Sequence, residues 1–366
     1  MKVGIVTQPL LGNYGGILQN YALQQTLRKL GHTPQTIDYI MTNSAWRYFR
    51  HTCKYHLRKI LGKTSCNEQA PTRLRLRTSH MDEFVKQHIA TTEPTTKYLA
   101  QTIVTHKMEA IVVGSDQVWR PKYNDRIEDM YLDFAIKANI KRIAYAASFG
   151  VDKWEYGNSQ SKRCRSLAKL FDAISVREKS GEKLCREHLD TEATTVLDPT
   201  LLLNAEDWNK LCKDIPRQEK PILAVYLLKS HNKQHVQNNL RFIQKMASEK
   251  NLEIKFFTAD TAGSISIEEW LATFRDAKMV ITDSFHGTVF SILNHRDFLT
   301  LGNPSRGMAR LNTLLNELGI ENRLISPSDY NAEDIKPLDY SQVEIRLAAL
   351  RDHSLHFLRK ALNGED

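Results

Sequence analysis

The chain has 366 residues, of which 41% are hydrophobic and 25% charged, and its formal net charge is +9. This length exceeds what one hydrophobic core usually serves and predicts two domains. No apolar run approaches the roughly 20 residues that a membrane-spanning helix needs. The N-terminal sequence also lacks the basic, apolar and small-residue order of a signal peptide. We therefore expect a soluble cytoplasmic protein.

The first half of the sequence alternates between strand-like apolar runs and helical patterns. This alternation predicts an α/β domain with a parallel sheet. The expected strands are 3–7, 35–39, 111–113, 143–147, 173–176 and 195–197, and the expected helices are 17–30, 161–170 and 179–187.

A second alternating series follows, and it predicts a second domain of the same kind. Its expected strands are 222–228, 253–257, 279–282 and 298–301, and its expected helices are 234–248, 267–274 and one directly after 287. We place the domains at 1–205 and 206–340, with a C-terminal helix over 341–362 that crosses back onto the first domain to bury its apolar face.

The excess positive charge is concentrated between Ser44 and His80, which contains nine basic residues and one acidic residue. Apolar residues recur there at helical spacing, at Trp46, Phe49, Cys53, Leu57 and Ile60, so the segment predicts a basic amphipathic helix. Packing of the helix on its own domain is the favoured interpretation. Peripheral contact with an anionic membrane surface or a lipid-linked substrate stays open. No recognised motif indicates nucleic-acid binding.

The five cysteines are widely spaced and form no CxxC pair, so we expect neither a disulfide framework nor a metal site. The glycine-rich turn after the first strand does not match the dinucleotide-binding pattern, and we expect no cofactor.

Four loops that follow predicted strands carry candidate binding groups. In the first, glycines at a helix start let a ligand approach the backbone, and the helix N-terminus favours anions. Its candidate substrate-binding residues are Asn13, Tyr14, Gly15, Gly16, Gln19 and Asn20. The second loop offers a carboxylate, an amide and an indole, which suit a hydroxyl-rich ligand, although a capped turn with a core tryptophan is equally consistent. Its candidates are Ser115, Asp116, Gln117 and Trp119.

The third and fourth loops carry groups suited to an anion and to proton transfer. Arg177 follows a strand, where its guanidinium group could bind a carboxylate or phosphate; considered alone, a surface ion pair with Glu178 is the favoured interpretation. His286 lies between Ser284 and Gly287 at a strand-to-helix transition, which is where open α/β sheets bind ligands. A basic loop with Arg306 and Arg310 follows.

The motifs GNYGGILQNYALQ, VVGSDQVW, AYAASFG, SVRE, VLDPTLLL and TDSFHGTVFSI occur in this order. Together they resemble the polysaccharide pyruvyl transferase family from about Lys2 to about Leu324. The resemblance implies two Rossmann-like domains facing across a cleft, as in GT-B glycosyltransferases. It also implies transfer of the enolpyruvyl group of the co-substrate phosphoenolpyruvate onto two hydroxyls of one sugar, which gives a cyclic ketal and phosphate.

By the same resemblance, His286 is the acid-base catalyst and Arg177 binds the donor anion. A basic residue in the later loop completes the anion pocket, and we assign this role to Arg310 over Arg306. Asp116 is expected as a catalytic base or as scaffold, and Asp283 has the same two alternatives. The implied acceptor is a bacterial glycan precursor carried on undecaprenyl lipid. Two other functions stay open: a nucleotide-sugar glycosyltransferase on the same architecture, and a catalytically silent member that binds glycan or anion.

Overall fold

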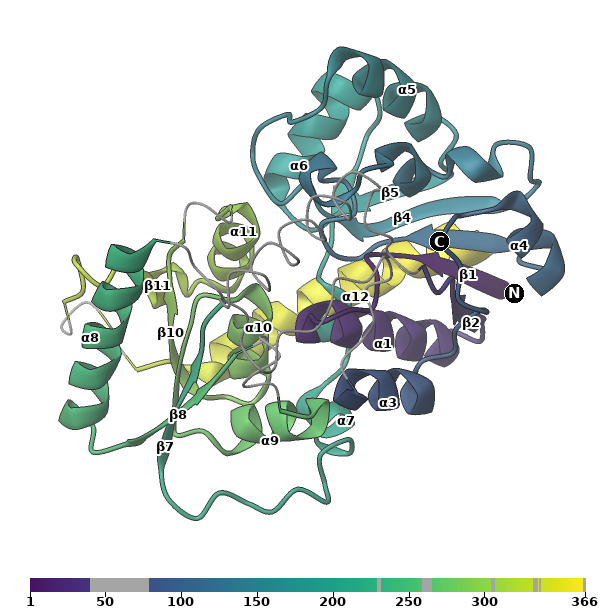
Figure 1. The fold of residues 1–366 in the computed structure, drawn as a ribbon. Helices are drawn as coiled ribbons and strands as arrows, with labels where there is room; N and C mark the ends of the chain where they lie inside the picture. Colours follow the sequence, from purple (N-terminus) through teal and green to yellow (C-terminus); the bar gives the residue numbers. More distant parts are fainter. Residues whose placement is uncertain are drawn as a thin grey trace, which may run out of the picture.

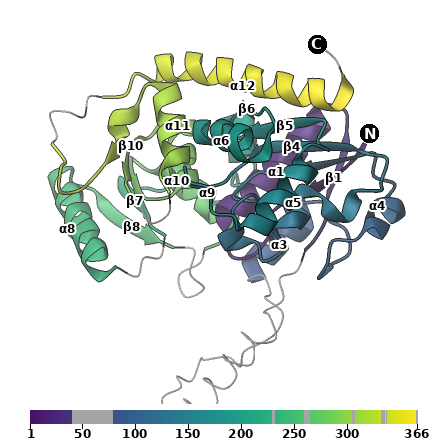
Figure 2. The same ribbon diagram turned by 90° about the horizontal axis from the view of Figure 1, so that it is seen from above.

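The structure is a computed structural model, and it describes residues 1–39, 79–228, 232–258, 265–303, 307–331, 335 and 337–364. The described chain forms two parallel sheets with helices packed around them (Figures 1 and 2). This is the predicted α/β class with two Rossmann-like units.

The first sheet has six parallel strands in the order β2-β1-β3-β4-β5-β6. The central strand β3 is buried at all four positions, which is why its sequence is a continuous aliphatic run. Pro34 lies in β2, an edge strand, where its missing N–H costs no ladder hydrogen bond. The strands are β1 (Lys2–Val6), β2 (Thr33–Thr36), β3 (Ala110–Val113), β4 (Lys141–Ala147), β5 (Ala173–Val176) and β6 (Thr194–Thr195).

The second sheet has five parallel strands in the order β11-β10-β9-β7-β8. Its strands are β7 (Ile222–Tyr226), β8 (Glu253–Phe257), β9 (Met279–Thr282), β10 (Asp297–Leu301) and β11 (Leu324–Ile325). The chain passes from the first sheet to the second through the short helices η5 (Pro199–Leu202) and α7 (Ala205–Asn209). The predicted division of the chain at residue 205 stays a prediction.

Helices flank both sheets in the described residues. Those before the second sheet are α1 (Tyr14–Lys29), α3 (Ser79–His88), α4 (Ala100–His106), α5 (Asn158–Ala168) and α6 (Lys179–Leu184). Those within the second unit are α8 (Lys233–Glu249), α9 (Ile267–Asp276), α10 (Phe285–Leu293) and α11 (Ala309–Leu318). The predicted elements agree with these bounds to within a few residues. The sequence patterns did not reveal α3, α4, α11 or the two-residue strand β11.

The C-terminal helix α12 (Tyr340–Asn363) crosses both units (Figure 2). Near its start, the hydroxyl of Tyr340 donates to the carbonyl of Arg296 in the second unit. Near its end, Nζ of Lys141 in β4 donates to the carbonyl of Leu362 at 2.6 Å. The prediction that this helix returns to the first domain is therefore confirmed.

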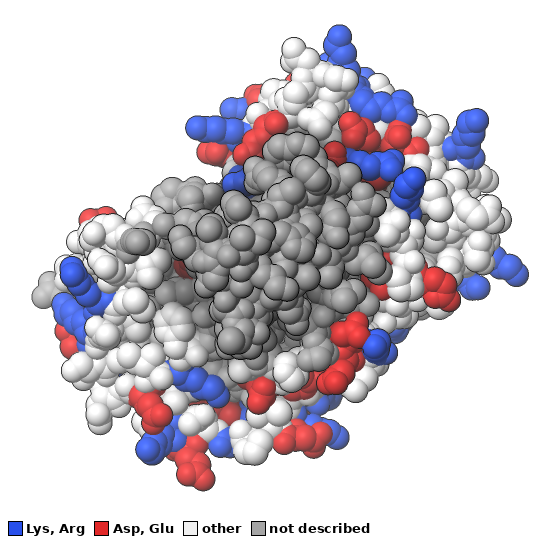
Figure 3. All heavy atoms as spheres, viewed as in Figure 1, with Lys and Arg blue, Asp and Glu red and all other residues white. Residues whose placement is uncertain are grey.

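On the face shown in Figure 3, the lysine and arginine side chains of the described residues are interspersed with aspartate and glutamate. The predicted basic amphipathic helix of residues 44–80 falls almost entirely outside the described residues. No helix in the described part of the chain is both long enough and apolar enough to cross a membrane.

Tyr14, at the start of α1, contacts the second unit through hydrogen bonds and ring stacking. Its hydroxyl donates to the carbonyl of Ile265 at 2.6 Å and accepts from the Ile265 N–H at 3.0 Å. Its ring stacks on Trp270 of α9 with centroids 5.7 Å apart. Burial raises the pKa of Tyr14 to about 12, so the hydroxyl stays a donor at neutral pH.

We expect Tyr14→Phe to lower the free energy of unfolding by about 1–3 kcal/mol, because both groups of Ile265 lose a buried partner. Urea denaturation measures this loss. Tyr330→Phe is the matched control, since the Tyr330 ring packs on Phe242 and is only partly buried. Equal midpoints for the two variants would contradict the role of Tyr14 at this junction.

Candidate active site

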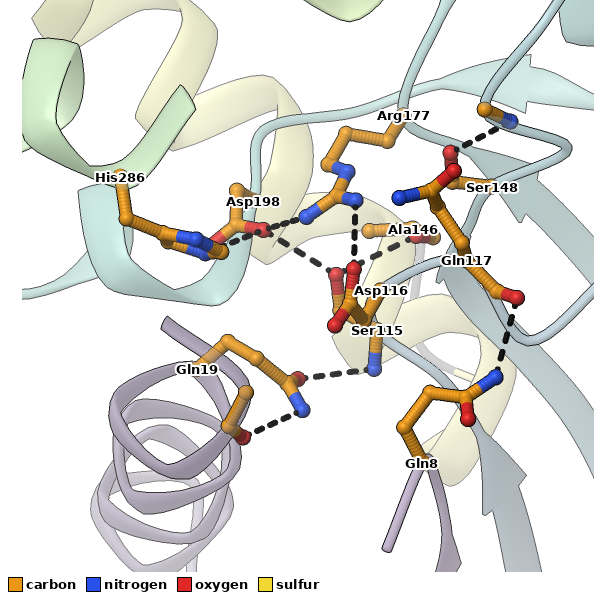
Figure 4. A network of polar contacts seen from close by, with 12 residues as sticks. Gln8, Gln19, Ser115, Asp116, Gln117, Ala146, Ser148, Arg177, Asp198 and His286 are labelled. Atoms are coloured by element: carbon orange, nitrogen blue, oxygen red, sulfur yellow. Dashed lines mark hydrogen bonds and ion pairs between the residues drawn. The ribbon is translucent and has the colours of Figure 1, made fainter. Parts of the chain in front are cut away.

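Three charged residues follow strands of the first sheet and meet at its carboxyl edge (Figure 4). Asp116 follows β3, Arg177 follows β5, and Asp198 is the N-cap of η5. Nη2 of Arg177 donates to Oδ1 of Asp116 at 3.1 Å, and Nη1 donates to Oδ2 of Asp198. Arg177 is only 3% exposed, so its guanidinium group is fixed by two carboxylates rather than by water.

The interpretation that Arg177 forms a surface pair with Glu178 is wrong. Glu178 is fully buried, and its Oε1 accepts hydrogen bonds from the N–H groups of Phe149 and Gly150, at 2.7 and 3.0 Å, and from the Ser148 hydroxyl. The two adjacent side chains therefore have different roles. Arg177 faces the site, while Glu178 stabilises residues 148–150 of the loop after β4.

The two carboxylates beside Arg177 stay ionised. Burial alone would raise the pKa of Asp198, but Arg177 and then His286 hold it far below its usual range. The same causes lower the pKa of Asp116, with Arg310 as a further positive neighbour. At neutral pH both groups are hydrogen-bond acceptors and weak bases.

His286 comes from the second unit. It lies in the first turn of α10, whose N-cap is Ser284, and it is 7% exposed. Its Nε2 is 3.6 Å from Oδ2 of Asp198, within ion-pair range but too far for a hydrogen bond, and it has no hydrogen-bond partner among the described residues. The loop enters α10 tightly, since a Cβ at Gly287 would lie 2.3 Å from Oγ1 of Thr282.

The other edge of the histidine ring rests on the glycine-rich start of α1. A Cβ at Gly15 would lie 1.9 Å from Nδ1 of His286, so only glycine leaves room for the ring. Gly15 thus takes part in the site by being small. Asn13, which precedes α1, is exposed.

Arg310, in the first turn of α11, completes the group. Its Cζ is 5.8 Å from the centroid of the Phe285 ring, and Cζ of Arg177 is 4.8 Å from the same centroid. Burial and then the proximity of Arg177 lower the pKa of Arg310 to about 10. Its Nε is buried without a hydrogen-bond partner, and no carboxylate pairs with it in the described part of the chain.

The loop before α11 approaches the first unit closely. Gly307 has a φ of 81°, and a Cβ there would lie 1.9 Å from the carbonyl oxygen of Gly150. This contact brings Arg310 beside Arg177. Arg306, the alternative anion-binding residue, lies outside the described residues.

Ser115 and Gln117 lie on either side of Asp116 and support the loop. The Ser115 hydroxyl donates to Oδ2 of Asp198 at 3.2 Å, and its N–H donates to Oε1 of Gln19 at 3.0 Å. Oε1 of Gln117 accepts from Arg120 at 3.2 Å.

Several predicted acceptor-binding residues lie in the interior instead of lining the site. Trp119 is fully buried, and its ring stacks on Tyr131 with centroids 4.8 Å apart. Its indole N–H donates to the carbonyl of Met130, so the core-tryptophan alternative holds.

Gln19 and Asn20 are also fully buried. Gln19 bonds to Thr7, Gly16 and Ser115, and Asn20 accepts from Thr36. Tyr14 faces α9. These side chains have no surface to offer a ligand in this structure.

The structure assigns roles to two further aspartates. Asp283 accepts from the N–H of Leu228 at 2.7 Å, which orients the loop before His286 and favours its scaffold alternative. Asp198, not chosen as a site residue, is the carboxylate nearest His286. The signal that could have found it is the VLDPTLLL motif, whose Asp-Pro pair is otherwise typical of a turn. Among the described residues, no three His, Cys, Asp or Glu side chains are grouped to hold a metal ion.

Two parallel-sheet units with charged residues from both at their junction define a GT-B-like α/β protein. A family profile, described as polysaccharide pyruvyl transferase, matches residues 13–305. The chain therefore belongs to the polysaccharide pyruvyl transferase family. A comparison with curated proteins gave no significant match.

Solved structures share the fold over the whole chain. A Listeria monocytogenes protein described as a putative UDP-N-acetylglucosamine 2-epimerase has 9% identity and a TM-score of 0.52, covering 100% of this chain and 97% of its own. S. aureus MnaA, solved with UDP, has 9% identity and a TM-score of 0.50, covering 98% and 90%. A Rickettsia africae glycosyltransferase has 13% identity and a TM-score of 0.48, covering 99% and 97%. At these identities the likeness concerns the fold alone.

We expect Gly15→Ala to displace the His286 ring and lower the free energy of unfolding by about 1–3 kcal/mol, as overpacking does. Gly16→Ala is the matched control in the same helical turn, because its Cβ would meet only the end of the exposed Asn13 side chain, at 3.2 Å. Urea denaturation of both variants measures the difference. Identical midpoints would show that His286 is not packed against Gly15.

Proposed function

We propose that the protein transfers the enolpyruvyl group of phosphoenolpyruvate onto two hydroxyls of one sugar in a polysaccharide precursor, forming a cyclic ketal and releasing phosphate. The observation that carries this proposal is the grouping of two arginines on the Phe285 ring beside a histidine whose Nε2 has no hydrogen-bond partner among the described residues. Family membership supports the same reaction class.

The arginines suit the donor because phosphoenolpyruvate carries both a carboxylate and a phosphate. Arg177 is held rigidly by Asp116 and Asp198, so its guanidinium group is preorganised. Arg310 has no carboxylate partner among the described residues, and its Nε is buried without a hydrogen-bond partner, so its partly buried guanidinium group favours an anion beside it. Neither arginine loses its charge at neutral pH, so both can stabilise the departing phosphate.

His286 supplies the proton that starts the reaction. In its protonated form, Nε2 gives a proton to the methylene carbon of the donor, and positive charge develops on the central carbon. A sugar hydroxyl attacks that carbon, the bond to the phosphate oxygen breaks, and a second hydroxyl closes the ring. One hydroxyl proton returns to His286 and the other leaves with phosphate, so the atoms balance.

Asp116 is a poor candidate for the general base, because its pKa is lowered. We assign it to holding Arg177. Of the residues predicted to bind the sugar, Asn13 is exposed and Gln117 is partly exposed, and these two remain our proposed acceptor contacts. We also propose an undecaprenyl-linked acceptor at the cytoplasmic membrane surface. Neutralising Arg47, Arg50, Lys54 and Arg58 and measuring liposome binding would test that part separately.

We expect His286→Gln to lower turnover by roughly 10²-fold or more while phosphoenolpyruvate still binds, because the proton donor is lost but both arginines remain. Phosphate release measures turnover, and thermal protection by the donor measures binding. His295→Gln is the matched control at the other end of α10, where its imidazole pairs with Glu344 on the surface. Near-normal turnover of a folded His286→Gln variant would eliminate its catalytic role.

Arg310→Gln should weaken phosphoenolpyruvate binding by about 10-fold or more, since it removes a charge-assisted contact to the anion. Titration calorimetry with the donor alone measures this without any acceptor. Arg359→Gln, on the exposed face of α12, is the control. Unchanged affinity in Arg310→Gln would remove Arg310 from the donor site.

The reaction itself is tested with phosphoenolpyruvate and a panel of galactose-, glucose- and N-acetylmannosamine-containing acceptors. Release of phosphate together with an acceptor mass gain of roughly 70 Da, dependent on His286, establishes ketal formation. If the donor neither turns over nor protects the protein, the proposal fails, and binding of a nucleoside diphosphate sugar then distinguishes a glycosyltransferase from a silent binder.

A further inference from the structure

Asp198 is a buried carboxylate whose two oxygens have different surroundings. Oδ1 accepts from the N–H of Thr200 at 3.0 Å and from its hydroxyl at 2.6 Å. Oδ2 accepts from Nη1 of Arg177 and from the hydroxyl of Ser115, and it lies 3.6 Å from Nε2 of His286. Asp198 is 1% exposed, so these contacts replace water entirely.

We propose that Asp198 is the positioning residue that holds Arg177 of the first unit and His286 of the second unit in one fixed arrangement. The inference rests on the proposed function for its kinetic consequence, but the arrangement itself can be tested without turnover. Asp198 does not touch the reacting atoms; it acts through the two residues that do.

The geometry gives Asp198 two separate effects. Its hydrogen bond with Arg177 fixes the direction in which the guanidinium group faces, with Asp116 as the second anchor. Its Oδ2 lies 3.6 Å from Nε2 of His286, within ion-pair range but too far to accept a hydrogen bond, so Nε2 has no hydrogen-bond partner among the described residues. The carboxylate therefore sits beside the ring and leaves Nε2 available to the substrate.

The chain on both sides of Asp198 is held by α12. The N–H of Leu197 donates to Oγ of Ser354 at 2.9 Å, and Nε of Arg351 donates to the carbonyl of Leu201 at 2.9 Å. The hydroxyl of Tyr145 donates to the carbonyl of Leu197 at 3.0 Å. The helix that spans both units therefore also fixes the turn that carries Asp198.

The charges that face His286 come from several elements. Asp198 and Asp116 supply negative charge; Arg177 and, farther along the site, Arg310 supply positive charge. From α1, Gly15 presents no side chain to the ring. A change in the surroundings of His286 on removing one carboxylate can therefore be assigned by comparing variants of Asp198 and Asp116.

Asp198→Asn tests the proposal most directly, because it removes the charge with little change of side-chain shape. The Thr200 N–H can only donate, so the carbonyl oxygen of the substituted amide would occupy the Oδ1 position and its NH₂ group would face Arg177 and His286. We expect the His286 imidazole to move or change its surroundings, because the carboxylate 3.6 Å from its Nε2 is replaced by a neutral amide. The measurement is the NMR spectrum of the histidine side chains at one fixed pH, with His286→Gln identifying the His286 signal.

Asp116→Asn is the comparison: it should move the His286 signal less, because only Asp198 is within ion-pair distance of Nε2 among the described residues. In the phosphate-release assay, Asp198→Asn should lower turnover by about 10-fold or more.

Thr200→Val carries the test if Asp198→Asn does not fold, since it removes only the hydroxyl bond to Oδ1 and keeps the charge. It should shift the His286 signal modestly and lower turnover severalfold. An unchanged His286 signal in a folded Asp198→Asn variant, or in Thr200→Val if that is the variant that folds, overturns the proposal. Absent phosphoenolpyruvate binding by the wild type would instead overturn the proposed function and leave the NMR result standing.

Discussion

The arrangement of the site depends on one buried carboxylate that serves two domains. Asp198 bonds Arg177 and lies within ion-pair distance of His286, although these residues follow strands of different sheets. Without the carboxylate, the buried guanidinium group of Arg177 would lose one of its two anionic partners, which is unfavourable in a poorly hydrated site. Three contacts keep this arrangement in place. Ser354 of α12 bonds the N–H of Leu197, the Thr200 hydroxyl donates to Asp198, and Gly15 leaves room for the His286 ring.

The fold follows from features that the sequence displays directly. The buried parallel strand β3 is a continuous apolar run, and parallel strands all end at the same edge of a sheet. Residues after such strands, including Asp116, Arg177 and His286, could therefore be named as candidates from their order. The roles of Arg177 and His286 came from the family resemblance, because Arg177 considered alone was interpreted as part of a surface ion pair. The loop before α11 could be assigned less surely, and the structure brings Arg310 into the group because Gly307 permits contact with Gly150.

The direction of individual side chains was not predictable, because it depends on contacts between distant segments. Gln19, Asn20 and Trp119 belong to site-forming motifs, yet each is buried with partners inside the first unit. Tyr14 is in the same motif as Gly15 but bonds a residue 251 positions away. Asp198 was overlooked for the opposite reason, because an Asp-Pro pair is typical of a turn and gives no sign of the arginine and histidine that meet it.

The proposed function depends most on where the donor binds, and an experimental structure with phosphoenolpyruvate bound tests this position most directly. We predict that the anionic oxygens contact the guanidinium groups of Arg177 and Arg310, and that the methylene carbon faces Nε2 of His286. Phosphoenolpyruvate bound away from these arginines, or a His286 whose Nε2 is turned from the methylene carbon, would contradict it.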